Sequence, residues 1–334
     1  MFAGKKILIT GGTGSLGTAL TQRLLDTDVD TIRIFSREEF KQIQMQSAFN
    51  DKRLRFLIGD VRDKERLARA LEDINIVIHA AALKQVPVAE YNPFEAVKTN
   101  VNGAQNLIEA CLDKNVEMAL AIGTDKAVSP FNTYGATKFL MERLFVSANL
   151  YKGNHKIKFL CVRYGNVLGS RGSVVPKFIS QITKGEKITI TDPTMTRFNI
   201  TMNQALEFIL RVLKSGEGGE IFVPKLKAYK LGDLKDALLD LLKGKNQTEI
   251  ISVRPGEKYH ESLISKDEIR NTFESKYDYV ILDEQLQNED NIGKLGLSKT
   301  SLRDQYSSDR VELLTKDELK DILIKENIIG AQHH

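Results

Sequence analysis

A short apolar segment that runs directly into a glycine-rich turn constrains this chain more than any other feature. Residues 5–10 (KKILIT) are typical of a buried strand, residues 11–17 (GGTGSLG) of a tight turn, and residues 18–25 of a helix. Glycine lets the backbone approach a bound pyrophosphate, and the following helix N-terminus stabilises its charge. This order predicts a dinucleotide site, with contacts from Gly11, Thr13, Gly14, Ser15, Leu16 and Gly17.

Further apolar segments continue the alternation of strands and helices. Strands are expected at residues 31–35, 54–58, 76–79, 118–122 and 159–163. Strands that alternate with helices predict an α/β fold with a Rossmann-type, doubly wound parallel sheet and right-handed crossovers.

The pattern changes after the strand at 159–163. We expect a nucleotide-binding domain over residues 1–170 and a smaller α/β substrate lobe with a C-terminal tail over 171–334, with later segments returning to the first domain. The charged tail beyond residue 265 contains no readable motif and is expected to end in a helix at 316–325.

The end of the second strand indicates which dinucleotide is bound. NAD-binding folds usually place an acid there, but this chain has Ser36 and Arg37, with Lys41 one turn later. A hydroxyl and a guanidinium suit a 2′-phosphate, which favours NADP over NAD. The alternative is a solvated loop, in which Glu38 and Glu39 weaken the positive field.

A second polar cluster follows the strand at 118–122. Thr124, Asp125 and Lys126 come directly after it, and Tyr134 and Lys138 stand four residues apart on the next helix. Residues at this spacing share one helix face, so the Lys138 ammonium is expected to lower the pKa of the Tyr134 phenol from about 10. These groups are expected at the binding crevice of the sheet, where they indicate a redox site.

Composition excludes several classes of function. A net charge of +4 with interspersed signs does not indicate a nucleic-acid-binding protein. No apolar run approaches the roughly 20 residues of a membrane span, and no signal peptide is recognisable at the start. Cys111 and Cys161 are expected to be buried free thiols, which fits a cytoplasmic protein. No metal site is expected.

The motifs together resemble those of extended short-chain dehydrogenases/reductases that modify nucleotide sugars. More narrowly, residues 1–265 resemble the inverting UDP-N-acetylglucosamine 4,6-dehydratases of pseudaminic acid biosynthesis. The shared segments include residues 59–63 (GDVRD), 79–84 (HAAALK), 88–93 (VAEYNP), 124–127 (TDKA), 163–167 (RYGNV), 169–176 (GSRGSVVP) and 254–258 (RPGEK). Retaining sugar dehydratases carry glutamate at the position of Lys126, and a capsular-sugar branch has methionine at Tyr134. Gly123 and Asn199 depart from the usual serine and aromatic residue.

This resemblance implies a reaction in which tightly bound NADP is recycled. Tyr134 would take the proton of the 4-hydroxyl, and Thr124 would hydrogen-bond the 4-oxygen. Lys126, kept neutral by burial beside cationic neighbours, would remove the C5 proton and return it with inversion. Asp125, protonated, is the candidate acid for loss of the 6-hydroxyl. The product would be UDP-2-acetamido-2,6-dideoxy-β-L-arabino-hex-4-ulose, a precursor for flagellin glycosylation.

The resemblance also assigns ligand contacts and an assembly. Cofactor contacts beyond the glycine turn and the Ser36 loop would be Asp60, Val61, Ala80, Lys84, Tyr134, Lys138, Val167 and Arg171. Substrate contacts would be Lys84, Thr99, Asn100, Asn166, Val174, Thr191, Arg197, Arg254 and Glu257. A homo-oligomer, plausibly a hexamer, is implied.

Three alternatives stay open from the sequence. A UDP-sugar C4 or C2 epimerase would share the cofactor site. A simple dehydrogenase would consume NADP stoichiometrically. A non-catalytic NADP-sensing protein of this fold would bind cofactor without turnover, although such proteins usually lack the Tyr-x-x-x-Lys pair.

Overall fold

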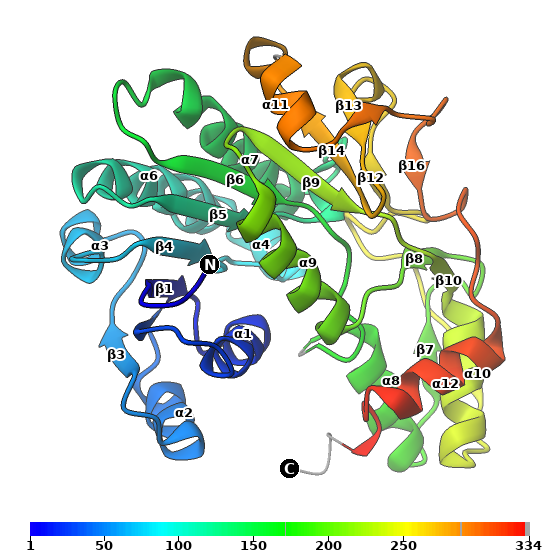
Figure 1. Cartoon of the computed structure of the whole chain (residues 1–334). Coiled ribbons are helices and arrows are strands. Elements are labelled where there is room, and N and C mark those ends of the chain that lie inside the picture. Colours follow the sequence, from blue (N-terminus) through cyan, green and yellow to red (C-terminus); the bar gives the residue numbers. More distant parts are fainter. Residues whose placement is uncertain (171, 288, 331–334) are drawn as a thin grey trace.

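A ten-stranded sheet forms the centre of the protein in the computed structural model, which describes residues 1–170, 172–287 and 289–330 (Figure 1). Its order is β15-β13-β14-β9-β6-β5-β4-β1-β2-β3. Neighbouring strands from β3 through β9 are parallel, and β14, β13 and β15 extend that edge antiparallel. The strands are β1 (Lys6–Thr10), β2 (Thr31–Ser36), β3 (Leu54–Ile58), β4 (Ile76–His79), β5 (Met118–Ile122), β6 (Lys158–Val162), β9 (Glu220–Pro224), β13 (Thr272–Glu274), β14 (Asp278–Leu282) and β15 (Ser298–Lys299).

Helices cover both faces of this sheet. Successive residues of β1 point to opposite faces, so Leu8 joins one hydrophobic core while Ile7 and Ile9 join the other. One core packs against α3 (Lys64–Ala70), α6 (Gly103–Asp113) and α7 (Thr133–Tyr151), and the other against α1 (Ser15–Leu25), α2 (Glu39–Phe49) and α9 (Met202–Ser215). The predicted doubly wound α/β fold is confirmed.

A smaller lobe lies beside the carboxyl end of the sheet. Figure 1 shows its helices gathered away from the large sheet, with the C-terminal helix α12 beside α10. A third hydrophobic core joins these helices. The lobe contains α8 (Val174–Thr183), α10 (Leu231–Leu242), α12 (Lys316–Lys325) and the short strands β7 (Ile188–Ile190), β8 (Thr196–Phe198), β10 (Ala228–Lys230) and β11 (Thr248–Ile250).

The charged tail contributes to both parts of the molecule. Strands β13, β14 and β15 return to the large sheet, and β16 (Tyr306–Ser307) pairs with β12 (Ser262–Ile264). The predicted helix at 316–325 is confirmed. Division of the chain at residue 170 stays a prediction.

The segment between β4 and β6 differs in detail from the expected one. Helix α4 (Val86–Tyr91) ends before Pro93, which lacks the N–H needed to continue the preceding turn. From Pro93 the chain is helical without a break through α5 (Pro93–Ala96), a π-helical turn (Val97–Asn102) and α6. Helix α7 begins at Thr133, where the Asn132 side chain caps it by accepting a hydrogen bond from the Gly135 N–H at 2.7 Å.

No helix among the described residues has the length and apolar character needed to cross a bilayer.

Candidate active site

A single cavity of about 1040 Å³ brings together almost all of the predicted site residues. It opens where the parallel strands end, as expected for a doubly wound sheet. Its lining includes Gly11, Thr13, Gly14, Ser15, Leu16, Gly17, Ser36, Arg37, Lys41, Asp60, Val61, Ala80, Lys84, Thr99, Thr124, Lys126, Tyr134, Lys138, Asn166, Val167, Val174, Thr191, Arg197, Arg254 and Glu257.

The glycine turn at residues 11–17 leaves space next to the backbone that larger side chains would occupy. Gly11 has φ +66°, and a Cβ there would lie 2.9 Å from the Cα of Ala81. A Cβ at Gly17 would lie 2.5 Å from the Gly12 carbonyl oxygen. Helix α1 begins directly after Gly14 with no side-chain cap, so its first N–H groups are free for an anion. This part of the cavity fits a dinucleotide pyrophosphate.

The loop after β2 presents the cationic groups expected for NADP. Ser36, Arg37 and Lys41 all line the cavity. The Arg37 guanidinium lies 3.9 Å from the Asp60 carboxylate, and Lys41 forms a 2.7 Å ion pair with Glu38. The guanidinium therefore lies within the cavity while its charge is only loosely neutralised.

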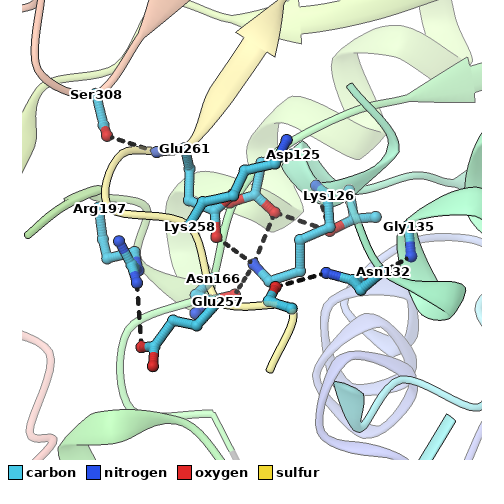
Figure 2. Close-up of polar contacts among 12 residues, drawn as sticks. Asp125, Lys126, Asn132, Gly135, Asn166, Arg197, Glu257, Lys258, Glu261 and Ser308 are labelled. Atoms are coloured by element: carbon cyan, nitrogen blue, oxygen red, sulfur yellow. Dashed lines mark hydrogen bonds and ion pairs between the residues drawn. The ribbon is translucent and has the colours of Figure 1, made fainter. Parts of the chain in front are cut away.

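Lys126 lies in an acidic environment, which corrects the expected cationic one. In Figure 2 its side chain extends between Asp125 and Glu261, with Nζ at 3.0 Å from Asp125 Oδ1 and 3.2 Å from Glu261 Oε1. Nζ also donates to Asn166 Oδ1 at 3.3 Å. Burial alone would lower the lysine pKa, but these two carboxylates raise it above its ordinary value. The two ion pairs therefore favour the ammonium form of Lys126.

The electrostatics around Tyr134 also differ from the prediction. Tyr134 and Lys138 share α7 and both line the cavity. Burial raises the pKa of Tyr134 to about 12, and the groups that oppose this rise are the Lys126 charge and a hydrogen bond with Thr124. Lys138 instead donates to the Met141 sulfur at 2.9 Å, and burial lowers its pKa to about 8 despite the nearby Glu142 carboxylate.

Asp125 is buried beside the cavity and contacts two residues that line it. Its side chain is 1% exposed and does not line the cavity; it accepts hydrogen bonds from the Thr124 hydroxyl at 2.9 Å and from Lys126. Burial raises the pKa of this carboxyl, and the Glu261 charge raises it further, whereas Lys126 lowers it. The carboxyl is thus an ion-pair partner of Lys126 whose burial favours uptake of a proton.

Asn100 is buried away from the cavity lining. Its side chain accepts from the Leu83 N–H at 2.8 Å and donates to the Leu83 carbonyl and the Thr137 hydroxyl, both at 3.0 Å. It thus ties the segment after β4 to α7, and a substrate contact by Asn100 stays a prediction. Arg171, a predicted cofactor contact, lies outside the described residues.

Arg197, Arg254 and Glu257 also line the cavity. The Arg197 guanidinium lies 3.3 Å from the Glu257 carboxylate, as Figure 2 shows, and donates to the carbonyls of Thr196 at 2.7 Å and Tyr259 at 3.0 Å. Asn132 donates to the Gly256 carbonyl at 2.9 Å, which fixes the loop around Arg254 against α7.

Glu261 is the residue that sequence reasoning missed. It lines the cavity and completes the acidic environment of Lys126. Its position three residues after the shared segment 254–258 was the available signal, but no pattern linked it to Lys126.

The structure explains the unusual Gly123. A Cβ there would lie 2.4 Å from Glu142 Oε1 and 2.6 Å from the Val162 carbonyl. Glu142 is fully buried and pairs with Arg163 at 2.7 Å. A serine at position 123 would therefore require Glu142 to move.

Comparison with known proteins places the chain in a family. The pattern of the polysaccharide biosynthesis protein family matches residues 7–283. The chain belongs to this family. The chain is 47% identical, over 97% of its length and 98% of the relative's, to a protein named UDP-N-acetylglucosamine 4,6-dehydratase (inverting) from Campylobacter jejuni subsp. jejuni serotype O:23/36 (strain 81-176).

Two further comparisons bear on fold and activity. The X-ray structure of Pen from Bacillus thuringiensis superposes with a TM-score of 0.92 at 38% identity, covering 98% of this chain and 99% of the other. A protein named UDP-glucose 4-epimerase from Rickettsia rickettsii (strain Sheila Smith) is 40% identical, over 97% of this chain and 96% of the relative. The family therefore includes relatives named for dehydration and for epimerisation.

Proposed function

We propose that this protein is an NADP-dependent lyase, an inverting UDP-N-acetylglucosamine 4,6-dehydratase. The observation that carries the proposal is a lysine amine, Lys126, inside the cavity beside the Tyr134 hydroxyl and paired with Asp125. An epimerase that only oxidises and reduces C4 needs the tyrosine but has no use for a second base. Removal and return of a C5 proton requires one.

Each residue has a separate task in this reaction. Tyr134 accepts the proton of the 4-hydroxyl, helped by the Lys126 charge and the Thr124 hydrogen bond, which both favour its anionic form. NADP, when bound, supplies the hydride acceptor for C4 and the donor for C6. Arg197, Arg254 and Glu257, which line the same cavity, would hold the UDP group.

The Lys126 ammonium must lose a proton before it acts as a base. Asp125 Oδ1 accepts a hydrogen bond from Nζ at 3.0 Å, and burial raises the pKa of that carboxyl. Transfer of one proton along this hydrogen bond converts the ion pair into a neutral amine and a protonated carboxyl. The amine then removes the C5 proton, and the 6-hydroxyl leaves as water with one proton from the Lys126–Asp125 pair.

Incubation of the pure protein with UDP-N-acetylglucosamine in D₂O tests this function. We expect a product lighter by one water, deuterium at C5 and no net formation of NADPH, measured by mass spectrometry, NMR and absorbance. A sugar of unchanged mass would rule out dehydration. A C4 or C2 epimer would support the epimerase alternative, which the Rickettsia relative's name favours.

NADP preference is expected to depend on Arg37. We predict that Arg37→Ala weakens NADP binding about 10- to 100-fold, which is the loss of one charge-assisted contact of 1.5–3 kcal/mol, and leaves NAD binding nearly unchanged. Calorimetric titration with each dinucleotide checks this, and Arg23→Ala, on α1 outside the cavity lining, serves as the matched control. Equal losses for both dinucleotides would contradict a 2′-phosphate contact.

The cellular role follows from the resemblance and remains part of the proposal. The product would feed pseudaminic acid or a related nucleotide sugar, used in flagellin glycosylation. Both cysteines are buried free thiols, which supports a reducing cytoplasm.

A homo-oligomer, plausibly a hexamer, is also proposed. Tyr91, Phe94, Phe131 and Leu140 are exposed apolar side chains on or beside α4, α5 and α7, which pack against one another. A monomeric mass by light scattering would contradict the assembly.

A further inference from the structure

Glu261 is a buried acid whose position requires an explanation. Its side chain is 3% exposed, yet it lines the cavity and pairs with Lys126 at 3.2 Å. Its second oxygen, Oε2, is buried and has no hydrogen-bond partner within the part of the chain that the structure describes. Buried carboxylate oxygens are normally satisfied, because desolvation without a partner is costly. Here the carboxylate that carries this oxygen is the one that pairs with Lys126, so its place calls for a functional reason.

The C-terminal tail forms two hydrogen bonds with the backbone of Glu261. The Ser308 N–H donates to the Glu261 carbonyl at 2.8 Å, and the Glu261 N–H donates to Ser308 Oγ at 3.0 Å, a contact drawn in Figure 2. Ser308 Oγ also contacts the Thr196 hydroxyl at 2.7 Å, which in turn meets His260 Nδ1 at 2.8 Å. These bonds fix the backbone of Glu261 against β8, so its carboxylate has little freedom to move away from Lys126.

The charges around Lys126 come from several elements. Asp125 belongs to the same turn as Lys126, Glu261 precedes β12, and Arg197 lies on β8 and opposes the two acids. Lys258 also faces Glu261, and the Tyr134 hydroxyl from α7 faces Lys126. Without Glu261 the amine would have, among the described residues, only Asp125, on its own turn, and the longer 3.3 Å contact with Asn166. Glu261 supplies the second fixed point.

We propose that Glu261 is a positioning residue for Lys126. Its carboxylate fixes the amine over the reacting carbon and, with Asp125, sets the pH at which Lys126 becomes a neutral base. The proposal rests on the dehydratase function and deepens it, because it links the C-terminal tail to the proton transfer at C5.

The pH dependence of turnover tests the proposal. UDP-N-acetylglucosamine deuterated at C5 makes proton removal limiting, so the acidic limb of kcat against pH reports the base. Glu261→Gln removes a negative charge that favours the ammonium. We expect its acidic limb to move to lower pH by about 1 to 3 units, with KM close to wild type. Glu261→Asp keeps the negative charge but moves it away from Lys126 by one methylene. We expect the acidic limb of kcat to stay near its wild-type pH and kcat itself to fall about 10-fold or more.

Controls separate this proposal from the function on which it rests. Glu274→Gln makes the same chemical change at a C-terminal acid that pairs with Lys225 at 2.7 Å and does not line the cavity; its profile should match wild type. Wild-type protein that does not dehydrate the sugar would overturn the function. If the wild type is active, two results with Glu261→Gln would overturn only the role of Glu261. One is an acidic limb at the wild-type pH, and the other is a raised KM with unchanged kcat. Should Glu261→Gln not fold, as judged by its melting temperature, wild-type kcat in Glu261→Asp would overturn it equally.

Discussion

Lys126→Arg is expected to fold and bind NADP like the wild type while losing dehydration by about 10²- to 10⁴-fold. The guanidinium retains the charge that pairs with Asp125 and Glu261 at 3.0 and 3.2 Å, so the two buried carboxylates stay compensated. It does not lose a proton in proteins, so it cannot become the neutral base that C5 requires. Product mass, measured over a long incubation, reports the loss.

The first half of the reaction distinguishes a missing base from a damaged site. Oxidation at C4 requires Tyr134 rather than Lys126, so Lys126→Arg mixed with UDP-N-acetylglucosamine should accumulate reduced cofactor, seen by its near-ultraviolet absorbance. Lys225→Arg, at an ion pair away from the cavity, is the matched control and should behave as wild type. Near-normal dehydration by Lys126→Arg would remove Lys126 from its assigned role.

Lys126→Ala is a less selective change at the same position. It removes the base but also leaves Asp125 and Glu261 buried without their cation, which is costly. Both variants should lose dehydration, but only the alanine variant should also lose thermal stability. This difference is why the arginine variant is the sharper test.

Features encoded locally could be predicted from the sequence. The strands 54–58, 76–79 and 118–122 and the final helix were identified with their observed bounds, because each is an apolar or periodic run flanked by clear breaks. The glycine turn also encodes its own geometry, since Gly11 needs its positive φ and its missing Cβ. A cavity lined by both motif clusters then follows from parallel strands ending at one edge.

Features that depend on distant partners could not be predicted. The acidic pair around Lys126 is one such feature, because Glu261, which faces the amine together with the neighbouring Asp125, reaches the site through a loop fixed by Ser308. The partners of Asn100 are a similar case, because only the fold reveals that its amide faces Leu83 and Thr137. The tail strands are short and charged, so they give no periodic signal.

A second large effect is expected from Arg163, which lies beneath the active site. Its side chain is 1% exposed and pairs with Glu142 at 2.7 Å and Glu268 at 2.9 Å, and it donates to the Leu263 carbonyl at 3.0 Å. Arg163→Met keeps the apolar bulk but leaves two carboxylates facing each other in the interior. We expect the free energy of unfolding to fall by about 3–5 kcal/mol, measured by denaturant titration near neutral pH.

The same variant at an exposed pair provides the control. Lys225 pairs with Glu274 at 2.7 Å, but both side chains are partly exposed to solvent. Lys225→Met should therefore cost no more than about 1 kcal/mol. Equal losses in the two variants would mean that burial of the Arg163 cluster contributes nothing to its effect.

The loss in Arg163→Met should diminish in acid, and the sign follows from the two carboxyl groups. In the wild type, burial would raise the pKa of Glu268, but Arg163 lowers it below its ordinary value, so its contribution to stability is lost as pH falls through that folded pKa. Burial keeps the pKa of Glu142 raised even beside Arg163, and without the guanidinium the folded pKa of Glu268 also rises above the unfolded value of about 4.3, so protonation favours the folded variant. Wild type loses stability toward low pH while the variant loses less, and the two unfolding curves should converge below about pH 4. Parallel curves from neutral to acid pH would show that the Arg163 side chain stabilises the fold by packing rather than by its charge.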